Sequence, residues 1–140
     1  ELLVAGHAGA TPRPVAKVAS GGELSRLALA IAVETSQLGE APTLIFDEVD
    51  SGIGGAVAHT VGRLMRRLGD DRQVLAVTHL AQVAAYAHHH LRVTKVHEGG
   101  ATHSDVEPLD GEARVEELAR MLGGSGSDVS LAHARELLQA

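Results

Sequence analysis

Two adjacent carboxylates, Asp47 and Glu48, directly follow the apolar run TLIF at 43–46. An apolar run of this length after Pro42 is typical of a strand buried on both faces. Carboxylates at the end of such a strand are costly to hold together unless a cation or hydrogen bonds compensate. Asp oxygens suit Mg²⁺, and a neighbouring Glu can orient or deprotonate a water. The pair indicates either a metal-assisted hydrolytic site or an exposed acidic turn that caps the next helix.

A second candidate site is the stretch SGGE at 20–23. Ser20 and Glu23 have the spacing of a capping box, in which the two glycines would be filler at a helix start. Alternatively, bare backbone at Gly21 and Gly22 lets an anion such as phosphate approach the unpaired N–H groups of the helix N-terminus. These residues alone leave both interpretations open.

Histidines form the third set of candidates. His79 ends the apolar run QVLAVT at 73–78, and it would lie beside the Asp47–Glu48 pair if the two strands are neighbours. The alternative is a structural hydrogen-bonding histidine. The run 88–90 (HHH) is expected to be a solvated helix end, because adjacent residues point in different directions and make a poor preformed metal site.

The order of strand-like and helix-like stretches predicts an α/β fold, with a mainly parallel sheet flanked by helices, a β-hairpin and C-terminal helices. In such sheets ligands bind at the carboxyl ends of the strands. The stretch 6–14 is expected to be a loop, because Pro12 and Pro14 oppose regular structure. The expected strands are 1–5, 43–46 and 73–78, the hairpin is 90–96 with 102–109, and the expected helices are 20–38, 57–68, 80–87, 112–122 and 128–139.

Composition excludes several classes of function. The 140 residues carry a net charge of −6, which provides no basic footprint for a DNA backbone. With one Tyr, one Phe and no Trp, the chain lacks the rings that stack on single-stranded nucleic acid. It has no Cys and no apolar run long enough to span a membrane, and we expect no signal peptide. Because the sequence begins with Glu1, we expect a fragment or a processed chain.

Taken together and in order, these motifs resemble the second half of an ABC-type ATPase head. ASGGE at 19–23 resembles the signature motif, LIFDE at 44–48 the Walker B motif with its catalytic glutamate, VDSGIGG at 49–55 the D-loop, and His79 the switch histidine. The longer stretches FDEVDSGIGG, VTHLAQVAAYAHHH and LDGEARVEELARMLGG resemble the C-terminal part of the RecN family of bacterial DNA repair ATPases, which are relatives of SMC proteins. The resemblance spans essentially the whole chain.

The resemblance implies ATP as substrate and Mg²⁺ as cofactor. Glu48 would activate the attacking water, His79 would contact the γ-phosphate, and Asp47 would hold Mg²⁺ through water. The remaining implied residues bind the nucleotide of an opposite head or lie at the seam between heads: Ser20, Gly21, Gly22, Glu23 and Asp50.

One part of an ABC head is missing from the sequence. No G-x-x-x-x-G-K-[ST] motif is present, since neither Lys17 nor Lys95, the only lysines, follows a glycine. No sustained heptad segment is present either. We therefore expect 1–140 to be the C-terminal lobe of a split head, with the Walker A lobe and a coiled coil on another segment. Alone, this lobe should neither bind ATP tightly nor hydrolyse it. The exposed edge of its sheet should need the other lobe to cover it, because an open hydrophobic edge invites association.

The resemblance further implies a bacterial cytoplasmic, nucleoid-associated protein of DNA double-strand break repair and recombination. Its expected partners are the Walker A lobe, a second head in an ATP-dependent dimer, and DNA through the full-length protein, without a membrane. Two alternatives remain: a transporter-type nucleotide-binding lobe and a non-catalytic interaction domain. Val49 and Asp50 after Glu48 favour RecN over a transporter, and the presence of Glu48 and His79 disfavours a non-catalytic domain.

Overall fold

The computed structural model divides the chain into two compact units, Glu1–Thr78 and His79–Ala140. Each unit is described by itself. The residues that the structure describes are 3–5, 8–15, 21–35, 41–124 and 126–139.

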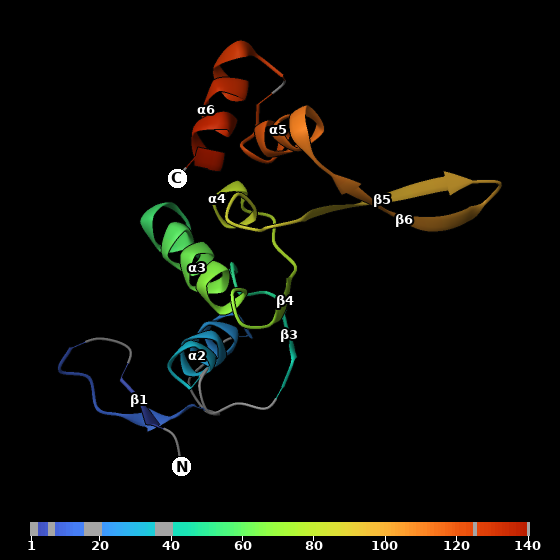
Figure 1. The fold of residues 1–140 in the computed structure, drawn as a ribbon. Coiled ribbons are helices and arrows are strands. Elements are labelled where there is room, and N and C mark those ends of the chain that lie inside the picture. Colours follow the sequence, from blue (N-terminus) through green and yellow to red (C-terminus); the bar gives the residue numbers. More distant parts are fainter. Residues whose placement is uncertain (1–2, 6–7, 16–20, 36–40, 125, 140) are drawn as a thin grey trace. The chain divides into compact units, whose positions relative to one another are not determined.

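The first unit is built around a pair of parallel strands, β3 (Thr43–Phe46) and β4 (Gln73–Ala76). The helix α3 (Gly55–Leu68) connects them, as a parallel pair requires. Thr43 pairs with Gln73 and Phe46 with Ala76, so both strands end at the same edge (Figure 1). The prediction that the two apolar runs are strands of a parallel sheet is confirmed, and the structure adds that they are neighbours, which the sequence left open.

The two faces of this parallel pair differ. The helices α2 (Gly21–Glu34) and α3 lie on the same side of it (Figure 1), where Phe46 is buried. Successive side chains of a strand point to opposite faces, so Ile45 and Val77 lie on the other face. There Ile45 is 71% exposed and Val77 is 64% exposed. Parallel sheets normally have both faces covered, so this apolar face lacks a layer within the described chain.

A short antiparallel ribbon corrects one prediction. β1 (Leu3–Val4) pairs with β2 (Arg13–Pro14), so the assignment of 6–14 wholly to a loop was wrong at its end. A proline can occupy a strand of a two-stranded ribbon, because a strand with one neighbour does not use all of its N–H groups.

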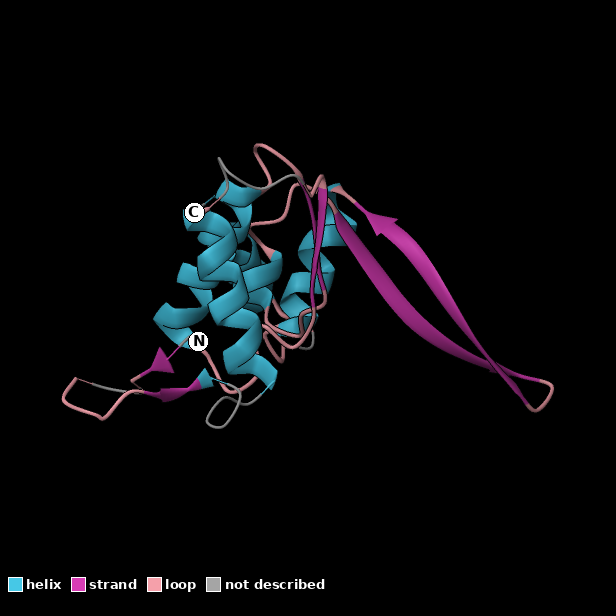
Figure 2. Cartoon of the chain, turned by 90° about the horizontal axis from the view of Figure 1, so that it is seen from below, coloured by secondary structure: helices cyan, strands magenta, loops and turns pink. Residues whose placement is uncertain are grey.

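The second unit consists of a long hairpin and three helices. Strands β5 (His90–Glu98) and β6 (Ala101–Leu109) pair antiparallel and extend as a twisted ribbon (Figure 2). Gly99 and Gly100, both with positive φ, form the two-residue turn, as expected for a hairpin of this type. The helices are α4 (Ala81–Ala84), α5 (Gly111–Met121) and α6 (Asp128–Gln139).

The core of the second unit lies between its helices. Leu118 and Ala119 of α5 and Ala134 of α6 are fully buried. Arg114 ties α5 to the end of α4 by donating hydrogen bonds to the carbonyl oxygens of Ala84, Ala85 and Ala87. This unit therefore covers its main apolar surface with its own helices.

Candidate functional site

The start of α2 packs directly against the segment that follows β3. Gly22 is buried there, and a Cβ atom at this position would lie 2.8 Å from Ser51 Cβ and 3.0 Å from the Glu48 carbonyl oxygen. A side chain would therefore require the backbone of the 48–51 segment to shift. Close packing of the helix against this segment accounts for one of the two adjacent glycines.

The other glycine, Gly21, is exposed and faces a side chain rather than a backbone. A Cβ atom on Gly21 would lie 2.5 Å from Glu48 Oε2. The Glu48 carboxylate thus lies against the first residue of α2. The structure brings together two motifs that are separated by 25 residues in the sequence, namely the glycine pair and the carboxylate pair.

Two side chains that the sequence reasoning missed hold the same segment. Ser25 Oγ donates a hydrogen bond of 2.7 Å to the Asp47 carbonyl oxygen. Arg26 Nη1 donates to the carbonyl oxygens of Val49, at 3.3 Å, and Ser51, at 2.8 Å. A signal was present in the spacing, because Ser25 and Arg26 stand four residues after Gly21 and Gly22 and therefore share their side of the helix.

The backbone of Glu48 adopts an unusual conformation. Its φ of 56° is the only positive φ of a non-glycine residue among the residues that the structure describes. The Glu48 N–H donates to Asp47 Oδ1 at 2.9 Å, and the Ser51 N–H donates to the Glu48 carbonyl oxygen at 3.0 Å. A non-glycine residue persists in this region only where its surroundings hold it, and such residues cluster at functional sites.

Asp50 is a buried member of the same turn. The residue is 3% exposed, and its Oδ2 accepts a hydrogen bond from the hydroxyl of Thr78, which lies just beyond β4. This contact fixes the turn after β3 to the end of the neighbouring strand. Contact of Asp50 with a nucleotide or a second head stays a prediction.

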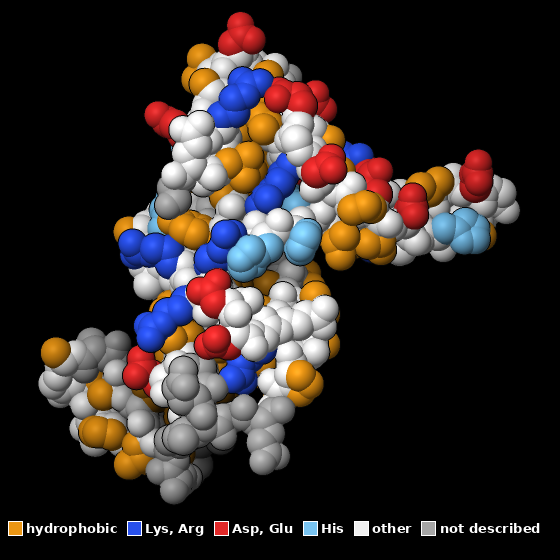
Figure 3. Space-filling model, in the orientation of Figure 1, with side chains coloured by type: hydrophobic (Ala, Val, Ile, Leu, Met, Phe, Trp, Pro, Cys, Tyr) orange, Lys and Arg blue, Asp and Glu red, His pale blue; other side chains and the backbone are white. Residues whose placement is uncertain are grey.

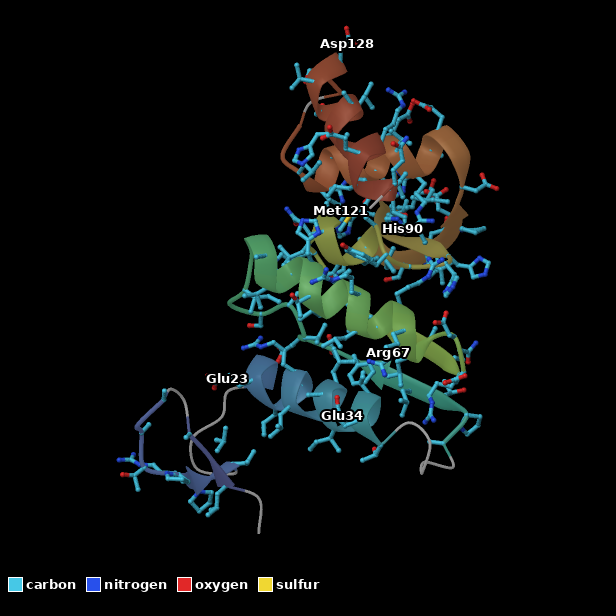
Figure 4. All side chains as sticks on the ribbon, turned by 60° about the vertical axis from the view of Figure 1, so that its left-hand side comes forward. Glu23, Glu34, Arg67, His90, Met121 and Asp128 are labelled. Carbon is cyan, nitrogen blue, oxygen red and sulfur yellow. The ribbon has the colours of Figure 1, made fainter. Side chains whose placement is uncertain are left out.

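The remaining predicted site residues lie in different places. Glu23 is exposed in the first turn of α2, at the opposite end of that helix from Glu34 (Figure 4). Ser20 lies outside the described residues. His79 is exposed and is the first residue of the second unit, so its cooperation with Glu48 stays a prediction.

The donor set after β3 suits a lightly held divalent cation. Asp47 is exposed at the carboxyl end of β3, and Mg²⁺ binds through one or two carboxylates while keeping several waters. Within the described ranges, no group of three or more His, Cys, Asp or Glu side chains could enclose a metal. A cation at Asp47 would therefore depend on waters and on the phosphates of a substrate.

The histidine run 88–90 is not a helix end, in contrast to the prediction. α4 ends at Ala84, and His90 is already the first residue of β5. His90, labelled in Figure 4, has its Nδ1 buried without a hydrogen-bond partner, and burial lowers the pKa of this side chain. The helix thus ends before the histidine run, and His90 pairs with Leu109 at the base of the hairpin.

An ion-pair cluster joins the hairpin to α5. The carboxylate of Glu117, 5% exposed, accepts two hydrogen bonds from Arg120, at 2.6 and 2.9 Å, and lies 3.6 Å from Arg92 of β5. Hydrogen bonds from Arg120 hold the pKa of Glu117 below its ordinary value, although burial opposes this shift. Because each charged group has a partner here, the cluster serves the structure of the second unit.

Comparisons with known proteins identify relatives that match nearly the whole chain. The chain is 54% identical over 140 residues to the DNA repair protein RecN of Vibrio cholerae and 52% identical over 140 residues to that of Streptomyces coelicolor, in each case over 99% of this chain. It is 57% identical over 125 residues to RecN of Deinococcus radiodurans. The chain is a homologue of RecN.

The chain spans about a quarter of the length of these relatives: 25%, 24% and 22%, respectively. No protein-family model matches it. A solved chain from work on ATP-driven dimerization and DNA-stimulated activation of SMC ATPases has a TM-score of 0.56 at 24% identity, over 85% of this chain and 71% of that one. The fold is therefore that of an SMC-like ATPase head. No described helix has the length and apolarity needed to cross a membrane.

Proposed function

We propose that this chain supplies the C-terminal half of an ATP-hydrolysing head in a RecN-type DNA repair protein. The observation that carries the proposal is the packing of the Gly21–Gly22 helix start against the Asp47–Glu48 segment, in a chain homologous to RecN. Within this head, Glu48 orients and deprotonates the attacking water. Its exposed carboxylate and its held backbone suit that role.

The other site residues act on the phosphates. Asp47 would hold Mg²⁺ together with water ligands, and such a cation would supply positive charge beside the transferred phosphoryl group. His79 donates to the γ-phosphate from the same head. The start of α2, with Ser20, Gly21, Gly22 and Glu23, offers N–H groups and positive potential to the nucleotide of a second head. Asp50 supports the seam between the two heads.

The head is completed by a segment outside this chain. The relatives are about four times longer, and the sequence lacks a Walker A motif. Ile45, Leu75 and Val77 leave one face of the β3–β4 pair apolar and exposed, so that a further layer can pack there. The isolated chain is therefore inactive as an ATPase and needs the Walker A lobe.

In the complete protein, ATP-dependent pairing of two heads acts in DNA double-strand break repair and recombination, in the bacterial cytoplasm at the nucleoid. The net charge of −6 disfavours a large DNA-binding surface on this chain. DNA is therefore contacted mainly through other parts of the full-length protein.

The test is ATP hydrolysis by the full-length protein that contains this chain, with Glu48→Gln compared with Glu34→Gln. Both substitutions remove one exposed carboxylate from the same unit. We expect Glu48→Gln to lower turnover by roughly a hundredfold or more, while Glu34→Gln leaves it unchanged. Equal turnover in both variants would remove Glu48 from the mechanism.

A further inference from the structure

The side-chain hydrogen bonds from α2 to the segment after β3 share one feature: they reach backbone carbonyl groups at alternate residues. Ser25 binds the carbonyl oxygen of Asp47, and Arg26 binds those of Val49 and Ser51. We propose that Ser25 and Arg26 are positioning residues that fasten the segment 47–51 to α2, so that contact made at the start of α2 is transmitted to Glu48. This inference rests on the proposed role of Glu48 in ATP hydrolysis.

Hydrogen bonds to carbonyl groups fix the path of the main chain whatever side chains it carries. The held carbonyl groups of Asp47 and Val49 lie on either side of Glu48, so that its backbone is constrained from both directions. The carboxylate of Asp50 is held separately by Thr78. The Glu48 side chain is left exposed while its main chain is anchored.

The positive φ of Glu48 makes this anchoring necessary. A φ of 56° is unfavourable for a residue with a Cβ atom, and it relaxes unless the neighbouring structure prevents it. The Arg26 guanidinium supplies two of the restraining bonds from one rigid, planar group. Loss of Arg26 therefore frees the turn in which Glu48 stands.

Gly22 makes the coupling tight. Because the space between Gly22 and the 48–51 segment is too small even for a Cβ atom, a displacement of the first turn of α2 toward this segment also displaces the residues that carry Glu48. In a pair of heads, the phosphate bound at the start of α2 belongs to the opposite head. Seating of that nucleotide is thereby coupled to the geometry of the water-activating group in this head.

The experiment measures kcat and KM for ATP in the full-length protein that contains this chain, with the variants Arg26→Ala, Arg26→Lys and Ser25→Ala. The matched control is Arg63→Ala, which removes an exposed arginine that donates a hydrogen bond to Thr60 of its own helix. We expect Arg26→Ala to lower kcat roughly tenfold to a hundredfold with KM nearly unchanged, since positioning is lost and nucleotide binding is kept. Arg26→Lys should recover part of kcat, and Ser25→Ala should have a smaller effect.

A merely structural role gives a different pattern. If Arg26 only stabilises the fold, Arg26→Ala lowers the fraction of folded protein. ATP binding by the double variant Arg26→Ala/Glu48→Gln would then fall as much as the turnover of Arg26→Ala alone. The proposal is overturned if Arg26→Ala and Ser25→Ala both keep kcat within about twofold of the parent while Glu48→Gln abolishes turnover. If Glu48→Gln itself leaves turnover intact, the proposed function fails and this inference fails with it. If Arg26→Ala does not fold, Ser25→Ala and Arg26→Lys decide the question by the same criterion.

Discussion

The two units of the chain bury apolar surface in different ways. In the second unit, α5 and α6 pack on each other, and Leu118, Ala119 and Ala134 are fully buried. In the first unit, α2 and α3 cover one face of the β3–β4 pair, while Ile45 on the other face is 71% exposed. The candidate catalytic carboxylates belong to the unit whose sheet is covered on one side only.

Within the second unit, the β5–β6 hairpin resembles the β3–β4 pair in leaving one apolar face exposed. On one of its faces Leu91, Val93 and Val106 are exposed, and apolar side chains are visible along it (Figure 3). Its other face carries Arg92 and Glu107, which form an ion pair. The candidate catalytic residues thus lie in the unit that leaves one sheet face uncovered, whereas the helices of the second unit bury their apolar surface against one another.

The largest expected effect on stability is in the helical core of the second unit. Leu118→Ala removes a side chain with 0% exposure, and the cavity should cost the chain about 2–5 kcal/mol of stability. Thermal unfolding followed by circular dichroism measures this loss. The control is Val129→Ala, at a position 80% exposed, which should change stability by no more than about 0.5 kcal/mol. Equal effects would contradict the assignment of the core.

A smaller effect is expected at the glycine pair. Gly22→Ala places a methyl group 3.0 Å from two carbonyl oxygens and should destabilise the first unit by about 1–3 kcal/mol. Gly21→Ala meets only the end of the Glu48 side chain, which can move, and should cost less. Chemical denaturation of the two variants compares them directly. A larger loss in Gly21→Ala would contradict the close packing at Gly22.

The ion-pair cluster predicts a pH dependence confined to the second unit. The pKa of Glu117 is below its ordinary value of 4.5, so the contribution of this carboxylate is fully present above pH 4.5 and is lost as the pH falls through the lowered pKa. Glu117→Gln should flatten the acid side of the stability profile. Amide hydrogen exchange in α5, followed as a function of pH, measures the stability of this helix. The control is Glu116→Gln, which removes an exposed carboxylate from the same helix. An unchanged acid slope in Glu117→Gln would contradict the assignment.

The smallest expected effect on the chain itself is at the uncovered sheet face. Ile45→Thr keeps a β-branched residue at an exposed position and should alter the stability of the chain by no more than about 0.5 kcal/mol. The same substitution should weaken association with the Walker A lobe, which calorimetry measures. Unchanged association would show that this face is not the contact surface.

Much of the framework follows from local pattern. The runs at 43–46 and 73–78 are apolar without alternation, which indicates parallel strands, and the structure pairs them in parallel. The hairpin follows from the glycines at 99 and 100. The strand at Arg13–Pro14 was missed, because proline indicates a loop unless its pairing partner is known.

The site was less predictable than the framework. Asp47, Glu48 and the glycine pair could be singled out because their residue types suit phosphate chemistry. The spacing of Ser25 and Arg26 from the glycine pair places them on the same side of the helix, but it does not reveal their partners, because the carbonyl groups that they bind lie more than 20 residues away and carry no sequence signal. The positive φ of Glu48 likewise depends on tertiary contacts, since glutamate does not favour it.

The most direct test of the split-site proposal is ATP turnover by this chain alone, by a separately produced Walker A lobe, and by the two mixed. We predict turnover in the mixture only, and its loss when the chain carries Glu48→Gln. Turnover by this chain alone, or turnover in the mixture that is indifferent to Glu48→Gln, would contradict the proposal.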